Sequence, residues 1–319
     1  MSAPQRPRVP RRDLDGVLLL DKPVGLSSND ALMCAKRLYL AKKAGHTGTL
    51  DPLASGLLPL CFGEATKFSQ DLLEADKTYE ATMRLGVRTT TGDAEGEVLE
   101  TREVRVDPAA LDSAMAGLRG QIVQVPPMYS ALKRDGKPLY EYARAGQTVE
   151  REGRVVTIHS LELLACALPD VTFRVKCSKG TYVRTLAEDI GAALGCGAHL
   201  VALRRTGVGA LTLEHAVTLD ALSGMEAPAR DAMLQPVDAL LSTFAPVRLA
   251  EEAARRFQQG QRLRVAELAS TAAGNEEGVR GAGEGARVRV YRDADGALLG
   301  VARVVGGVLA PERLVVMRP

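Results

Sequence analysis

The sequence predicts an α+β protein with a large N-terminal domain followed by a small, mostly β module. Segments that alternate apolar and polar residues are interspersed with segments whose apolar residues recur at helical spacing. Between residues 218 and 247, Pro228, Pro236 and Pro246 break the helical patterns and mark a candidate boundary. A length of 319 residues also suits about two domains.

Composition limits the classes of partner. Hydrophobic residues make up 46% of the chain, enough for ordinary buried cores. The 41 basic and 39 acidic residues leave a formal net charge of only +2, so a polyanion has to be met by local patches. Residues 1–14, which contain Arg6, Arg8, Arg11 and Arg12 among prolines, are expected to form a basic flexible arm that is solvated or touches phosphate.

The cysteine pattern argues against disulfides and zinc. The chain has five cysteines without a CxxC pair, and the ligand-like spacing of Cys196 and His199 has no second pair to complete a site. We therefore expect reduced thiols and no metal. The N-terminus lacks an apolar signal region, and no run of about 18 apolar residues occurs, so a cytoplasmic protein with no membrane contact is expected.

In the first half of the chain, residues 16–20 form an apolar strand that ends in a Pro-Gly turn. Ser27, Ser28 and Asn29 then offer N-caps for a helix that ends in four cations, which either complement the helix dipole or form a phosphate-facing rim. Residues 77–85 alternate as a strand with Tyr79 facing inward. Asp107-Pro108 begins a helix, which we expect to end at Gly120.

The second half starts with strands at residues 155–164 and 171–178. The apolar period then changes at Gly180 to helical spacing through residue 194, and residues 200–207 form another apolar strand carrying Arg204 and Arg205. Beyond the boundary, residues 249–259 form a helix, and residues 288–291 and 297–305 form strands around Asp295-Gly296. The Gly/Ala/Glu-rich residues 269–286 are expected to be a mobile loop.

One loop combines several chemically unusual features. Residues 45–58 read GHTGTLDPLASGLL, with Asp51 at the centre and His46 close upstream. Because Pro52 follows it, Asp51 is pushed toward an extended conformation, and the flanking glycines allow sharp bends. An ordinary Asp-Pro turn is the simpler interpretation. The histidine and the buried-strand pattern that follows favour a carboxylate presented for chemistry.

Three further places are candidate functional positions. Tyr79 is either a core tyrosine or a residue facing a site. Tyr182 and Arg184 stand at a strand-to-helix junction, where side chains point into clefts, and Arg184 needs a carboxylate; a surface ion pair with Glu188 is the alternative. Residues 125–144 (VPPMYSALKRDGKPLYEYAR) interleave tyrosines with cations, which suits RNA contact or an amphipathic surface hairpin. Residue chemistry alone indicates a single-Asp enzyme or an RNA-binding protein.

Six motifs in one order carry a resemblance. GHTGTLDPLASGLL resembles the catalytic motif of the bacterial pseudouridine synthases of the TruB type, which isomerise uridine at position 55 in the T-loop of tRNA. Five further motifs also occur here in the order in which that family has them: LLLDKPVGLSSNDA, KTYEA, VPPMYSALK with GKPLYEYAR, KGTYVRTL and LVALRRTGVG. The resemblance is dense over residues 15–240 and looser beyond.

The resemblance implies a fold, a domain division and partners. It implies the pseudouridine synthase fold, a mixed, largely antiparallel sheet flanked by helices, over residues 15–245, with a thumb segment at about residues 125–150. Residues 246–319 would be a PUA-like RNA-binding module. It further implies a tRNA T-arm as substrate, no cofactor, no obligate protein partner and a monomer.

The resemblance also assigns roles residue by residue. Asp51 matches the family's catalytic aspartate, and His46 matches a histidine that enters the T-loop. Tyr79 matches the tyrosine that stacks on the flipped base and helps remove the C5 proton, and Arg184 matches the arginine paired with the aspartate. The remaining matches are to residues that line or support the pocket: Tyr182, Leu203, Lys22 and Pro23.

The implied mechanism is base flipping, attack by Asp51 at C1′ or at C6, glycosidic bond cleavage, uracil rotation and C–C rejoining. A closed apolar pocket would exclude water, and Arg184 would favour the ionised form of Asp51. Two alternatives stay open. A protein with this fold could bind or refold tRNA without catalysis, and a nucleoside or RNA hydrolase would release free uracil.

Overall fold

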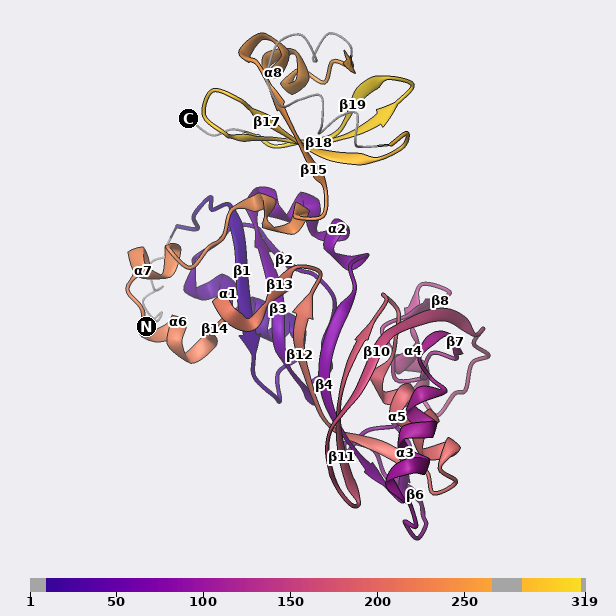
Figure 1. Cartoon of the computed structure of the whole chain (residues 1–319). Helices are drawn as coiled ribbons and strands as arrows, with labels where there is room; N and C mark the ends of the chain where they lie inside the picture. Colours follow the sequence, from indigo (N-terminus) through magenta and orange to yellow (C-terminus); the bar gives the residue numbers. More distant parts are fainter. Residues whose placement is uncertain (1–9, 266–282, 317–319) are drawn as a thin grey trace, which may run out of the picture.

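A computed structural model describes residues 10–265 and 283–316. Its centre is a sheet with ten strands among these residues (Figure 1). Eight strands follow one another across it in the order β14 (Val217–Thr218), β1 (Gly16–Lys22), β3 (Ala54–Phe62), β12 (Ala198–Val208), β4 (Lys77–Leu85), β11 (Asp170–Cys177), β10 (Arg154–Ala167) and β7 (Gly120–Gln124). Two short strands extend it, β2 (Ala44–His46) beside β3 and β13 (Leu211–Thr212) beside β12.

The sheet is mixed and largely antiparallel, as predicted. Only β1 with β14 and β12 with β3 run parallel, and the other pairs are antiparallel. Every strand expected in the first domain is present. The expected end of the helix at Gly120 is wrong, because α3 (Pro108–Ala116) ends at a Gly117 cap and Gly120 begins β7.

Two cores divide this sheet into two lobes. In the first lobe, α1 (Ser28–Leu38) and α6 (Leu219–Gly224) cover β1 and β3, with Leu18, Leu58 and Phe62 fully buried. In the second lobe, α3 and α5 (Val183–Ala193) cover β4, β10 and β11, with Phe173 and Leu186 fully buried. Tyr79 on β4 and Leu203 on β12 contact both cores, so these two strands form the junction between the lobes.

The remaining elements lie around this frame. The chain between β3 and β4 forms the 3-10 helix η1 (Gly63–Phe68) and α2 (Ser69–Leu73), and the hairpin of β5 (Val87–Thr89) and β6 (Val98–Thr101) follows β4. After β12 come the 3-10 helices η2 (Leu213–His215) and η3 (Val237–Leu241), with α7 (Ala227–Asp231) before η3. The thumb segment contains the hairpin of β8 (Lys133–Arg134) and β9 (Lys137–Pro138), followed by α4 (Leu139–Arg144).

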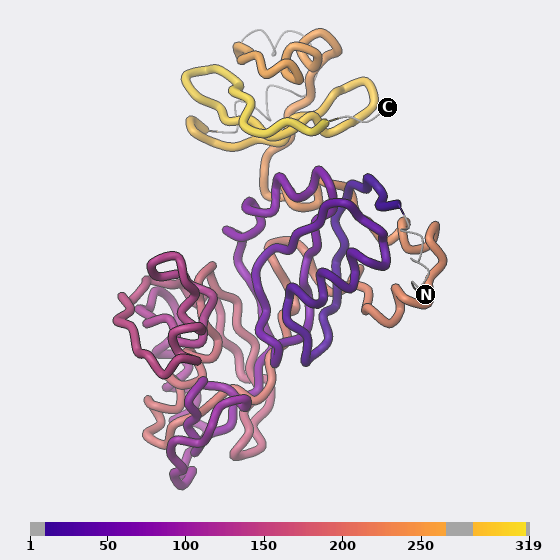
Figure 2. Tube along the Cα trace, turned by 180° about the vertical axis from the view of Figure 1, so that it is seen from behind, coloured from indigo at the N-terminus to yellow at the C-terminus, as the bar shows by residue number. Residues whose placement is uncertain are grey.

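A second sheet forms the C-terminal module. Its order is β15 (Ala245–Leu249), β17 (Arg287–Arg292), β18 (Leu298–Val305), β19 (Val308–Leu314) and β16 (Leu263–Arg264), with α8 (Glu251–Gln258) packed on it. The mostly β character predicted for this region is confirmed. Figure 2 shows the module beside the first lobe and away from α3 and α5. Most of the predicted mobile loop, residues 269–282, lies outside the described residues.

The predicted flexible arm needs a correction over residues 10–14. The Arg12 backbone N–H donates to the Leu40 carbonyl at 2.6 Å, and its guanidinium pairs with Asp231 of α7 at 2.5 Å. These bonds fix the chain from Arg12 onward. Residues 1–9 lie outside the described part of the chain.

No helix among the described residues is long and apolar enough to span a bilayer. The five cysteine thiols are free. His199, which was paired with Cys196 on spacing alone, is a core residue whose Nδ1 lies 2.9 Å from the Val87 carbonyl oxygen.

Candidate active site

The loop of residues 45–58 folds back on the sheet between β2 and β3. Gly48 and Gly56 take φ values of 70° and 98°, which side chains rarely adopt. At Gly56 a Cβ would also lie 2.3 Å from the Arg205 carbonyl oxygen, so only glycine lets β3 and β12 approach here. The turn closes through the Ala54 N–H, which donates to the Asp51 carbonyl at 3.0 Å. The Asp51 side chain therefore projects from a constrained backbone.

A buried serine ties this loop to α1. The Ser28 hydroxyl donates to the Leu50 carbonyl at 3.0 Å and accepts from the Leu50 N–H at 2.8 Å. Next to it, the Gly25 N–H donates to the Pro52 carbonyl at 2.8 Å. The residues on both sides of Asp51 are thus bonded to the segment that joins β1 to α1.

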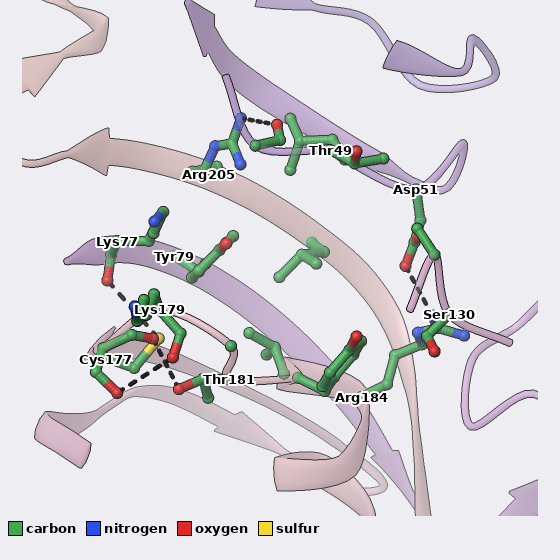
Figure 3. Close-up of a pocket in the computed structure, with 18 of the residues that line it drawn as sticks. Thr49, Asp51, Lys77, Tyr79, Ser130, Cys177, Lys179, Thr181, Arg184 and Arg205 are labelled. Carbon is green, nitrogen blue, oxygen red and sulfur yellow. Dashed lines mark hydrogen bonds and ion pairs between the residues drawn. The ribbon is translucent and has the colours of Figure 1, made fainter. Parts of the chain in front are cut away.

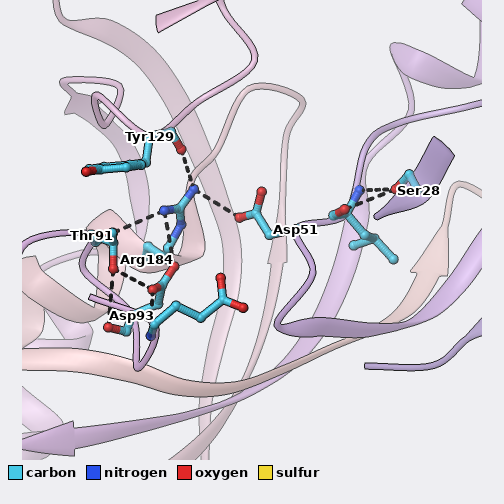
Figure 4. Close-up of polar contacts among 8 residues, drawn as sticks. Ser28, Asp51, Thr91, Asp93, Tyr129 and Arg184 are labelled. Carbon is cyan, nitrogen blue, oxygen red and sulfur yellow. Dashed lines mark hydrogen bonds and ion pairs between the residues drawn. The ribbon is translucent and has the colours of Figure 1, made fainter. Parts of the chain in front are cut away.

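Arg184 is the centre of the polar network (Figure 4). It is 5% exposed, on the first turn of α5, where the predicted strand-to-helix junction is confirmed. Its Nη2 lies 3.0 Å from Asp51 Oδ2 and donates at 2.7 Å to the carbonyl of Tyr129 in the thumb segment. The carboxylate that Arg184 required is therefore Asp51, and the structure gives it a second one as well.

That second carboxylate belongs to Asp93, in the turn between β5 and β6. Asp93 is 3% exposed, and its Oδ2 lies 3.2 Å from Arg184 Nη1, which also donates to the Thr91 carbonyl at 3.1 Å. The other oxygen of Asp93 accepts from the Thr91 hydroxyl at 2.5 Å and from the Glu95 N–H at 3.1 Å. Asp93 is therefore fully bonded on both oxygens, and it orients the guanidinium toward Asp51.

A cavity of about 260 Å³ opens beside this network. Asp51, Arg184 and Ser130 lie at one end, and Lys77, Tyr79 and Arg205 lie at the other (Figure 3). Tyr182 and Leu203 also line it. The backbone of Tyr182 is held by the Gln124 side chain, which accepts from its N–H at 3.0 Å and donates to its carbonyl at 3.3 Å. The cavity is not wholly apolar, because two cations close its far end.

The environment raises the pKa of Asp51 above its ordinary value. Burial is the main cause, because it disfavours the charged carboxylate, and the nearby Asp93 adds to it. Arg184 and Lys22 oppose the shift through their positive charges, and Arg184 also through its hydrogen bond. The expectation that Arg184 favours ionisation is right in direction, but burial outweighs it.

The other predicted residues lie outside the cavity lining. Lys22 is fully buried, and its ammonium donates to the carbonyls of Pro23 at 2.8 Å and Leu26 at 2.6 Å. Burial lowers its pKa to about 8, against the attraction of Asp51. Lys22 and Pro23 thus stabilise the turn under the Asp51 loop. His46 sits on β2 opposite Leu60, with a buried Nδ1 that has no hydrogen-bond partner among the described residues.

Sequence reasoning missed three buried polar residues around the site: Ser28 as a loop anchor, Asp93 and Arg205. Each pairs with a segment far away in the chain, so no local pattern marks it. A weak signal existed for Asp93, which lies in the turn-forming stretch TTTGDAEG. The described residues contain no group of three or more His, Cys, Asp or Glu side chains that could hold a metal ion.

Solved structures share this architecture. A chain in the crystal structure of a Cbf5-Nop10-Gar1 complex is 28% identical, with a TM-score of 0.72, over 94% of this chain and 84% of that one. A chain in the structure of an H/ACA RNP bound to a substrate RNA containing 2′-deoxyuridine is 27% identical, with a TM-score of 0.71, over 95% and 86%. The fold is that of the pseudouridine synthases.

Family models and curated relatives narrow the class further. Residues 36–183 match the model of the TruB family pseudouridylate synthase N-terminal domain. Residues 184–242 match the tRNA pseudouridylate synthase B C-terminal domain, and residues 245–315 the C-terminal model of pseudouridine synthase II TruB.

Two relatives named tRNA pseudouridine synthase B cover nearly the whole chain. That of Burkholderia mallei (strain ATCC 23344) is 77% identical over 98% of this chain and 97% of its own length. That of Cupriavidus pinatubonensis is 65% identical over 97% and 96%. The chain belongs to the TruB family of pseudouridylate synthases, which are isomerases.

Proposed function

We propose that this enzyme isomerises uridine to pseudouridine at position 55 in the T-loop of tRNA. The observation that carries the proposal is the Asp51–Arg184 ion pair at the mouth of a cavity lined by Tyr79, Tyr182 and Leu203. The relatives named tRNA pseudouridine synthase B support tRNA as the substrate class. The proposed place of action is the cytoplasm.

Each part of the cavity has a role in this function. The target base leaves the folded loop and enters the cavity, which costs a few kcal/mol that contacts to phosphates and bases offset. Asp51 acts at C1′ or at C6, and the glycosidic C–N bond breaks. Arg184 holds the carboxylate in place. Tyr79 stacks on the base, while Leu203 and Tyr182 confine the detached uracil as it turns to present C5 to C1′.

The thumb segment, about residues 125–150, is proposed to close on the RNA. Its cations and tyrosines already lie in pairs: Lys137 is 4.8 Å from the ring centroid of Tyr142, and the Arg144 guanidinium is 5.3 Å from that of Tyr140. Its Tyr129 carbonyl accepts from the arginine that pairs with Asp51. The position of the thumb segment and the orientation of the Asp51 carboxylate are therefore coupled through the guanidinium of Arg184.

Two assignments lie outside the cavity. His46 does not line it, which suits a residue that touches the surrounding T-loop. The C-terminal module, about residues 246–319, is proposed to be a PUA-like RNA-binding unit; Arg255 on α8 is 67% exposed and offers a phosphate contact. The enzyme is proposed to act as a monomer with no obligate protein partner and no cofactor.

Tritium release from a T-arm hairpin carrying 5-tritiated uridine tests the proposal. C5 loses its hydrogen when it becomes the glycosidic carbon, so release of label reports isomerisation. The intact protein is expected to release label, and Asp51→Asn is expected to bind the hairpin and release none. An intact protein that binds both the hairpin and whole tRNA without releasing label would be a non-catalytic RNA-binding protein, and one that liberates free uracil would be a hydrolase.

A further inference from the structure

Arg205 is a buried cation without an obvious reason to be there. It is 1% exposed, the largest of the fully buried side chains among the described residues. Burying a charged group is costly unless an opposite charge or several hydrogen bonds compensate. No carboxylate of the described residues forms an ion pair with it, so its hydrogen bonds and its neighbours have to account for its place.

Two hydrogen bonds from Arg205 hold the loop that carries Asp51. The Arg205 Nε donates to the Leu57 carbonyl on β3 at 2.7 Å. Its Nη2 donates to the Gly48 carbonyl at 3.1 Å. A Cβ at Gly48 would lie 3.3 Å from Arg205 Nη1, so the loop rests directly on the guanidinium.

The neighbour of Arg205 on the adjacent strand is Tyr79. The register of β12 and β4 places Arg205 directly opposite Tyr79, so both side chains project from the same face of the sheet. Both residues line the same cavity, with Arg205 and Tyr79 at the end away from Asp51 (Figure 3). Arg205 therefore bonds the loop that carries Asp51 and stands opposite Tyr79, which lines the same cavity.

We propose that Arg205 is a positioning residue with two roles: from its place opposite Tyr79, its positive charge stabilises the phenolate that accepts the C5 proton, and its hydrogen bonds to Gly48 and Leu57 hold the loop that carries Asp51. This inference rests on the proposed function. The C5–H bond breaks after the C1′–C5 bond has formed, and its electron pair becomes the C5=C6 bond. The N1=C6 pair moves onto N1, which takes a proton from water, and Tyr79 later passes its proton to solvent.

Burial and the charge of Arg205 act on Tyr79 in opposite directions. Burial raises the pKa of Tyr79 and is the larger cause, and the positive charge of Arg205 opposes that rise. Burial lowers the pKa of Arg205, and Tyr79 opposes that shift. Other titratable groups interact with this pair: Cys177 and Asp51 with the tyrosine, and Lys22, Lys77 and His46 with the arginine.

The first test needs no turnover. Alkaline titration of the near-ultraviolet phenolate band is compared between the intact protein and Tyr79→Phe, and the difference is the titration of Tyr79. The same difference is measured in Arg205→Met and Arg205→Lys backgrounds. We expect Arg205→Met to move the Tyr79 midpoint to higher pH and Arg205→Lys to move it less. An unchanged midpoint in a folded Arg205→Met protein overturns the proposal.

The second test is a double-mutant cycle with tritium release. Arg205→Met is expected to lower kcat at least about 10-fold in the intact background, because it weakens a proton acceptor. In the Tyr79→Phe background the same change is expected to matter less than roughly 3-fold, because the two residues act as a unit. Equal losses in both backgrounds would show that Arg205 acts apart from Tyr79.

Control variants distinguish a specific effect of Arg205 from a general loss of charge, misfolding or a wrong proposed function. Arg84→Gln removes a guanidinium that is 47% exposed on the same strand as Tyr79, and is expected to leave kcat unchanged. If Arg205→Met does not fold, Arg205→Lys carries both tests, since it keeps the charge but not the fork of donors. If the intact protein releases no tritium, the proposed function fails, while the titration still decides the pairing of Arg205 with Tyr79.

Discussion

At the scale of single residues, the site combines charges that burial disfavours with partners that keep them in place. Asp51 shares one guanidinium with Asp93, and both carboxylates lie within 3.2 Å of it. Asp93 has no exposed face to offer a substrate, so it acts by fixing Arg184. The ion pair with Arg184 therefore keeps the Asp51 carboxyl in its orientation, although burial raises its pKa.

The raised pKa of Asp51 predicts a pH-dependent stability with a definite sign. The native state binds this proton more tightly than the unfolded chain does, so ionised Asp51 costs stability, and the cost appears as pH rises through its native pKa. We expect Asp51→Asn to become progressively more stable than the intact protein as pH rises through that value. Thermal melts from acid to neutral pH measure the difference.

Asp170→Asn is the matched control with the opposite sign. The hydrogen bond from Arg84 lowers the pKa of Asp170, so its ionised form contributes stability that is lost as pH falls through the native value. This variant should be less stable than the intact protein at neutral pH, and the difference should vanish in acid. A relative loss of stability by Asp51→Asn with rising pH would contradict the assigned direction.

At the scale of elements, the Asp51 loop is held by secondary structure on both sides. Two adjacent serines at the start of helix α1 have different hydrogen-bond partners. Ser27 caps the helix by accepting from the Asp30 N–H at 3.1 Å, whereas the buried Ser28 bonds the backbone of Leu50. Only the capping role follows from sequence rules, because the Leu50 contact depends on how the loop returns to the helix.

These adjacent serines make a paired prediction. Ser28→Ala leaves the Leu50 N–H and carbonyl unpaired in the interior and is expected to cost about 1–3 kcal/mol of unfolding free energy. Ser27→Ala removes a cap and is expected to cost about 1 kcal/mol. Because Leu50 precedes Asp51, kcat for tritium release should fall much further in Ser28→Ala. Equal kcat values in the two variants would show that the loop does not depend on this anchor.

At the scale of the whole molecule, the C-terminal module is bonded to the segment between β3 and β4. Arg287 on β17 pairs with Asp71 on α2, which is 5% exposed, and with Glu312 on β19 at 2.7 Å. Arg313 donates to the Lys67 carbonyl, and the Val316 N–H donates to Glu64 at 2.8 Å. The same segment contributes Leu73 to the lining of the cavity, so the module is bonded to a segment that borders the candidate site.

Arg287→Gln should weaken this contact. It leaves the buried Asp71 carboxylate without its cation, which is expected to cost about 1–3 kcal/mol after allowance for the partial exposure of Arg287. Calorimetry is expected to show one unfolding transition for the intact protein and two for the variant. Arg255→Gln on α8, which breaks an exposed pair with Glu252, should leave the single transition in place. A single transition in both variants would rule out Arg287 as the link.

The topology of the whole sheet explains which parts of the fold and the site could be predicted from the sequence. Strands such as β4 and β11 follow from alternation, and Asp51 and Arg184 stand out because a Pro-constrained acid and a cation in an apolar helix pattern are locally odd. The order of the sheet does not follow, because β3 and β4 are consecutive along this stretch yet β12 lies between them. The roles of Asp93 and Arg205 depend on that non-local pairing and were missed for the same reason.

The central place of β12 also has a consequence for synthesis. Strand β12 pairs with both β3 and β4 but is synthesised after them. Until Val208 has left the ribosome, β3 and β4 each have an unpaired edge, and no strand joins the two halves of the sheet. Open edges and late, long-range pairing make a nascent chain slow to close and prone to wrong partners. Because β12 also carries Leu203 and Arg205, the cavity is completed in the same step that joins the two half-sheets.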